Sequence, residues 1–79
     1  MISTDMLLEF FEEDLGVDID GIEPETRIFS SGIIDSFALV TLMTFLEKAG
    51  GFRINPADVN LDNMDSIARI LDYSRRAAQ

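Results

Sequence analysis

The pair Asp35-Ser36 offers the most promising chemistry in this chain, which contains neither histidine nor cysteine. A turn-forming Ser-Ser-Gly at residues 30–32 precedes the pair, and a long helical pattern follows it and stops at Gly50-Gly51. The start of a helix favours negative charge, because its first backbone N–H groups have no partner within the helix. A hydroxyl at this position is therefore well placed to carry a phosphate-bearing group.

Two assignments of the N-cap of this helix are open from the sequence. If Ser36 is the N-cap, its hydroxyl accepts a hydrogen bond from a backbone N–H, a structural role worth about 1 kcal/mol. If Asp35 is the N-cap, we expect the Ser36 hydroxyl to face outward, where a phosphodiester would gain roughly 0.3–1 kcal/mol from the helix dipole. Asp35 could then also contact Mg²⁺ while an enzyme delivers the phosphate, since carboxylates are hard oxygen ligands.

The absence of histidine and cysteine removes the usual base at neutral pH and any thiolate, so we expect no catalytic residues and no metal site. Carboxylate or lysine chemistry stays open in principle. The spacing of the acids at positions 9, 12 and 13 predicts a solvated helix face rather than a shielded catalytic pair. Asp18 and Asp20 resemble the start of a calcium loop, but Glu23 stands where glycine is needed and Phe29 where glutamate is needed.

The formal charge of −9 argues against nucleic acid and anionic membranes as partners, because both would repel the chain. It favours basic protein surfaces, although acidity can also serve solubility alone. No apolar run approaches the ~20 residues needed to span a bilayer, and the N-terminus lacks a basic signal region. We therefore expect a cytoplasmic protein without membrane insertion.

Hydrophobic periodicity predicts four helices in the 79 residues. This pattern indicates one domain, residues 1–79, folded as a small all-α four-helix bundle with a short third helix. The expected helices run from a Ser3 or Thr4 cap to Gly16, from Asp35 or Ser36 to about Ala49, from Asn55-Pro56 to about Val59, and from an Asp62 or Asn63 cap to Arg75-Arg76.

A long connection, residues 17–34, joins the first two helices. Apolar residues recur along it, and we expect them to hold the connection against the helices in an ordered conformation. They are Val17, Ile19, Ile22, Ile28, Phe29, Ile33 and Ile34. Within the second helix, Leu42, Phe45, Leu46 and Ala49 form the stripe that we assign to the core.

Three parts of the sequence together resemble the acyl carrier protein family, and especially its stand-alone and peptidyl-type carriers. They are IEPETRIF at residues 22–29, GIIDSF at residues 32–37, and the apolar helix that closes on glycine. The similarity continues through Ile54, Pro56, Asp58, Ser66-Ile67 and Ile70, and so covers nearly the whole chain in order.

The resemblance implies a four-helix bundle whose motif serine, here Ser36, carries 4′-phosphopantetheine from coenzyme A. It implies a Mg²⁺-dependent phosphopantetheinyl transferase as one partner, with Asp35 as the adjacent acid. A loading ligase and downstream synthases or transferases are the other implied partners of a monomeric carrier. Such a carrier holds an acyl or aminoacyl thioester on the cofactor and does no chemistry itself.

The chain departs from fatty-acid carriers in its second helix, where Glu47 is the only acid. We therefore expect Leu39, Val40 and Met43, with Glu47, to form the partner-binding surface, although the three apolar residues could instead pack in the core. Phe37 replaces a more usual leucine, and Gly50 and Gly51 leave the end of this helix less defined. The carried group and the pathway stay open, and the rival interpretation is an unmodified, carrier-like interaction domain.

Overall fold

The computed structural model describes residues 2–78, apart from the side chain of Ser36. Those residues form helices and no strands, which confirms the predicted all-α fold. The elements are α1 (Thr4–Glu13), α2 (Ser36–Gly50), a 3₁₀ turn (Pro56–Asp58), α3 (Leu61–Met64) and α4 (Ile67–Ala77). None of the described helices has the length and hydropathy needed to cross a bilayer.

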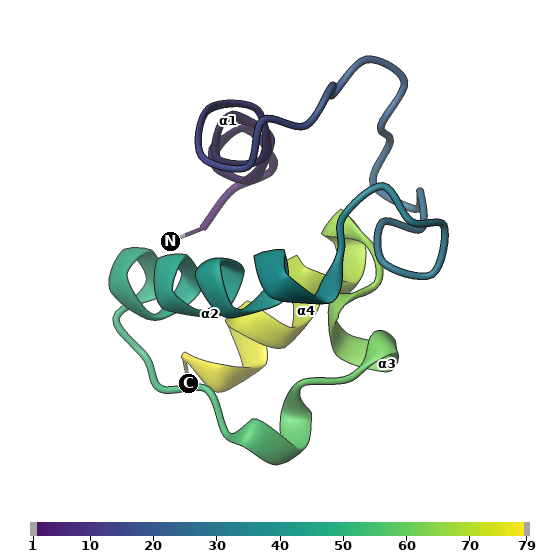
Figure 1. Cartoon of the computed structure of the whole chain (residues 1–79). Helices are drawn as coiled ribbons and strands as arrows, with labels where there is room; N and C mark the ends of the chain where they lie inside the picture. Colours follow the sequence, from purple (N-terminus) through teal and green to yellow (C-terminus); the bar gives the residue numbers. More distant parts are fainter. Residues whose placement is uncertain (1, 79) are drawn as a thin grey trace.

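The helices are arranged around α2 (Figure 1). Figure 1 shows α1 nearly end-on above α2, α4 crossing behind α2 and α3 below it, while the connection between α1 and α2 arches over to the start of α2. Phe10 of α1 stacks on Phe45 of α2 with ring centroids 4.4 Å apart. This stacking ties the second half of α1 to the second half of α2.

The core draws on every α-helix and on the connection. Leu42 and Leu46 are fully buried, as their helical spacing predicted, while Phe45 and Ala49 pack against the core half-buried. The buried apolar set is Ile2, Leu7, Phe10, Phe11, Ile28, Ile34, Leu42, Leu46, Ile54, Met64, Ile67, Ile70 and Tyr73.

Polar N-caps define where each helix begins. The Ser3 hydroxyl accepts a hydrogen bond from the Met6 N–H at 3.2 Å, so Ser3 rather than Thr4 caps α1. At the other end, α1 stops at Glu13 and not at Gly16. Gly16 adopts a φ of +67° and turns the chain, which lets the next N–H bond to the Phe11 carbonyl.

The predicted fourth helix is divided in two, and its predicted cap was wrong. Asn60 caps α3 and Ser66 caps α4, so that Asp62 and Asn63 lie inside α3. Local periodicity could not show the break, because apolar residues continue in helical spacing across it. Asp65 lies in the break with its side chain fully buried.

The connection from α1 to α2 is ordered against the helices. Ile28 and Ile34 are buried, while Val17, Ile19, Ile22 and Phe29 pack against the core half-buried. Ile33 is 40% exposed, so the prediction that it helps to hold the connection against the helices was wrong. Backbone hydrogen bonds add to this packing: the Ile28 N–H donates to the Asp65 carbonyl at 2.9 Å, and the Ala68 N–H donates to the Pro24 carbonyl at 2.9 Å.

Candidate functional site

The start of α2 is built by Asp35. Its backbone is extended, with φ −89° and ψ 173°, and its Oδ1 accepts a hydrogen bond from the Ala38 N–H at 3.0 Å. Asp35 is therefore the N-cap, and Ser36 is the first residue of α2. Of the two open assignments, the structure selects the one that frees the serine from capping. The predicted direction of the Ser36 hydroxyl lies outside the described side chains.

The surface around this helix start is apolar and carries little charge. Phe37 is 87% exposed and Val40 is 66% exposed, one turn further along α2. The first turn of α2 contains no acidic residue. Within that turn, no acidic side chain would repel a phosphodiester bound at the N-terminal N–H groups of α2. The Asp35 carboxylate lies just before the turn, at the N-cap. These residues fit the attachment of 4′-phosphopantetheine.

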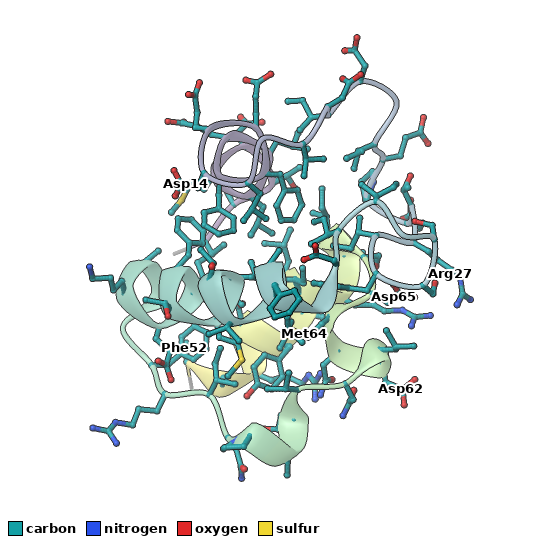
Figure 2. The ribbon with its side chains drawn as sticks, viewed as in Figure 1. Asp14, Arg27, Phe52, Asp62, Met64 and Asp65 are labelled. Carbon is teal, nitrogen blue, oxygen red and sulfur yellow. The ribbon has the colours of Figure 1, made fainter. Side chains whose placement is uncertain are left out.

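A groove of about 450 Å³ begins beside this helix start and runs between α2 and α3. Leu39 and Met64 line it from the two helices, and Figure 2 shows Met64 beneath the α2 ribbon. Its other lining residues are Phe29, Gly32, Ile34, Asp35, Val59, Asn60 and Leu61. Most of these side chains are apolar, so the groove could shelter a small apolar group held near Asp35.

The predicted partner-binding residues differ in their surroundings. Val40 is largely exposed, whereas Leu39 and Met43 pack half-buried against the core. Glu47 accepts a hydrogen bond from the Ile54 N–H at 2.9 Å and so ties α2 to the segment that follows it. Sequence reasoning left out Phe37, the most exposed large apolar side chain described, although its departure from the usual leucine was visible.

Sequence reasoning also left out Asp65, a carboxylate that holds the turn before α2. Its Oδ1 accepts hydrogen bonds from the N–H groups of Phe29 and Ser30, both at 2.9 Å. Its Oδ2 accepts one from the Ser30 hydroxyl at 2.7 Å, and a guanidinium nitrogen of Arg27 lies 3.7 Å away. In Figure 2, Asp65 lies at the turn and the Arg27 side chain extends outward.

The ionised form of Asp65 is favoured by these contacts. Burial raises the pKa of its carboxyl, but the hydrogen bonds from Ser30 and Phe29 and the charge of Arg27 outweigh burial, and the pKa lies below its ordinary value. The signal in the sequence was an acid between the apolar residues Met64 and Ile67. Here the helix breaks at this acid, and the buried carboxylate is paired with the turn before α2.

Comparison with protein families found one that covers most of the chain. The sequence profile of the phosphopantetheine attachment site family matches residues 5–73, which include the start of α2 and its surroundings. A comparison with curated protein sequences found no match. Because the family match spans far more than half of the chain, this protein belongs to the phosphopantetheine attachment site family of acyl and peptidyl carriers, whose cofactor is covalently attached 4′-phosphopantetheine.

Proposed function

We propose that Ser36 is the residue to which 4′-phosphopantetheine is attached. We further propose that the chain, as a single carrier domain, holds an acyl or aminoacyl group as a thioester and presents it to partner enzymes. The observation that carries the proposal is the capping of α2 by Asp35, which makes Ser36 the first helical residue in a region matched by the carrier family. We assign the chain no catalytic step of its own.

The cofactor supplies the thiol that this cysteine-free chain lacks. The chain itself contributes the start of α2, whose free N–H groups attract the negative phosphodiester. The first turn of α2 has no acidic residue that would repel it. Asp35 uses Oδ1 for capping, which leaves Oδ2 to contact Mg²⁺ while the transferase acts. The flanking groove between α2 and α3 favours cargo with a small apolar part.

Partner enzymes must approach the start of α2 to reach the cofactor. Phe37 and Val40 lie on that approach and are the exposed apolar residues of α2. Exposed aromatic and apolar side chains are typical of interaction surfaces. We therefore propose that partners contact these two residues directly, and that Leu39 and Met43 support the surface from their half-buried positions.

The attachment is tested by incubating the full chain with coenzyme A, Mg²⁺ and a transferase of broad specificity. We expect intact-mass spectrometry to show the mass gain of one phosphopantetheine, and we expect Ser36→Ala to show none. Ser3→Ala, which changes an exposed serine at the start of α1, is the matched control and should be modified like the wild type. An unmodified wild type, under conditions that load a known carrier, would instead support the unmodified interaction domain.

The partner surface is tested by placing a charge on α2. Val40→Glu should change the unfolding free energy by less than about 0.5 kcal/mol, because the side chain is largely exposed. It should nevertheless slow loading by the transferase. Met43→Glu puts a charge against the core, so we expect a loss of stability of about 1–3 kcal/mol together with the loss of loading. Wild-type loading by both variants would reject this surface.

A further inference from the structure

Asp65 connects two parts of the molecule that are far apart in sequence. It lies in the break between α3 and α4, and its carboxylate binds residues 29 and 30, which are 36 and 35 positions earlier in the chain. Its backbone carbonyl accepts the Ile28 N–H at 2.9 Å. One buried residue therefore accepts hydrogen bonds from three consecutive backbone N–H groups of the turn before α2.

The turn held by Asp65 closes on itself before α2 begins. The Gly32 N–H donates to the Phe29 carbonyl at 3.1 Å, and the Ile34 N–H donates to the Ile28 carbonyl at 2.8 Å. Residues 28–34 thus form a closed turn whose first residues are held by Asp65 and whose last residue, Ile34, is buried. Only the capping Asp35 separates this turn from Ser36.

The hydrogen bonds between Asp65 and the turn are strong because the Asp65 carboxylate is fully removed from water. A buried charge is tolerated where hydrogen bonds and opposite charge compensate for lost hydration. Here three hydrogen bonds and the Arg27 guanidinium compensate the Asp65 carboxylate. Moving the turn away would break these hydrogen bonds and leave the buried charge without partners. Around Asp65, the turn, α3 and α4 are thereby held in one arrangement.

We infer that Asp65 is a positioning residue for phosphopantetheine attachment, holding the 28–34 turn so that the start of α2 is presented in the conformation that the transferase binds. The inference rests on the proposed attachment at Ser36. Asp65 does not touch the reacting hydroxyl in this scheme. It acts through the turn, by keeping the binding-competent conformation highly populated.

This role predicts a particular kinetic signature. If the turn is loosened, only a fraction of carrier molecules has the competent conformation, and the apparent affinity for the transferase falls by that fraction. The KM for the carrier should rise, while kcat should change little because the bound carrier is ordered again. A purely structural role of Asp65 would lower the melting temperature without raising KM at temperatures where the variant is folded.

The experiment compares Asp65→Asn, Ser30→Ala and Asp58→Asn in the full chain. The first variant removes the anchoring charge, and the second removes only the hydroxyl bond to Oδ2. Asp58→Asn is the matched control, because the Asp58 carboxylate accepts its hydrogen bond from the Tyr73 hydroxyl, at 3.0 Å, and not from the turn. Each variant is assayed with coenzyme A, Mg²⁺ and a broad transferase, well below its melting temperature.

We expect Asp65→Asn to raise the KM for the carrier about tenfold, Ser30→Ala to raise it less, and Asp58→Asn to leave it within about twofold of wild type. Amide hydrogen exchange should quicken at Phe29, Ser30 and Ile34 in the first two variants only. Equal KM values for Asp65→Asn and Asp58→Asn would overturn the inference and leave the attachment at Ser36 intact. A wild type that is never modified would reject both.

Discussion

At the scale of single residues, two carboxylates near the start of α2 have different environments. Asp35 is exposed and uses one oxygen to cap α2, whereas Asp65 is fully buried and uses both oxygens to hold the preceding turn. The same functional group thus caps a helix in one place and orders a chain segment in the other. The difference arises from burial, which makes each hydrogen bond to Asp65 costly to lose.

The lowered pKa of Asp65 predicts a loss of stability in acid. The folded state binds a proton at this carboxyl less readily than the unfolded state, so its stabilising contribution is present above the unfolded pKa of about 3.9 and is lost as pH falls through the folded pKa. Urea unfolding at a series of pH values between about 5 and 2 measures this slope.

We expect Asp65→Asn to be less stable than the wild type at neutral pH and to lose less stability on acidification. Glu25→Gln, which removes one charge from an exposed side chain, is the control. If the slopes of Asp65→Asn and Glu25→Gln are the same, the buried carboxylate is not a source of the acid sensitivity.

At the scale of elements, the end of α2 depends on the contact between Gly50 and Phe52. A Cβ at Gly50 would lie 2.6 Å from Cδ1 of Phe52 and 3.2 Å from Cδ1 of Ile2. The helix extends through Gly50, one residue beyond the predicted end, and Gly51 caps it with a φ of +69°. The two glycines therefore have separate roles, one in packing and one in backbone conformation.

Moving Phe52 from its place in the packing should cost about 1–3 kcal/mol in Gly50→Ala. Alanine usually brings a gain of about 1 kcal/mol inside a helix, so we expect a net loss of up to about 2 kcal/mol of unfolding free energy. Thermal and urea unfolding measure the balance. In a Phe52→Ala background the clash is absent, so there Gly50→Ala should be neutral or stabilising, and an unchanged loss would contradict the packing explanation.

At the scale of the whole molecule, the net negative charge arises in one part of the chain. Residues 1–25 contain nine of the fifteen acids and none of the six bases, while residues 26–79 contain six of each. All nine acids are exposed, on α1 and on the first part of the connection. The formal charge of −9 is therefore a property of α1 and its connection, and α2 presents a nearly neutral surface.

This distribution predicts that α1 is destabilised by its own charges. Glu12 and Glu13 lie in the last turn of α1, where the helix dipole disfavours anions and where no base is present. Changing both to Gln should raise the melting temperature at low salt, with roughly 0.3–1 kcal/mol expected for each site. The gain should shrink in about 1 M salt, where the Debye length is about 3 Å.

The control for this prediction is Glu23→Gln with Glu25→Gln, which removes the same charge from exposed positions outside the helices. It should give a smaller gain. Equal gains from the two double variants would attribute the effect to net charge and not to the end of α1.

Local physics in the sequence determined the first two helices and the ordered connection between them, and it led to the proposal for Asp35-Ser36, but it did not show the break between α3 and α4. Capping and hydrophobic periodicity act over a few residues, so the buried stripe through Leu42 and Leu46 could be predicted without a structure. The resemblance through GIIDSF at residues 32–37 added the cofactor, and the family match confirmed it.

Only the tertiary structure decided which carboxylate is buried and which apolar residues of α2 are exposed. Asp65 is an anchor because the 28–30 backbone, brought from a distant part of the sequence, supplies its hydrogen-bond donors. Val40 and Met43 have the same apolar character in the sequence, yet one is exposed and the other packs against the core. Burial depends on which elements meet across the fold, and no spacing within one helix contains that information.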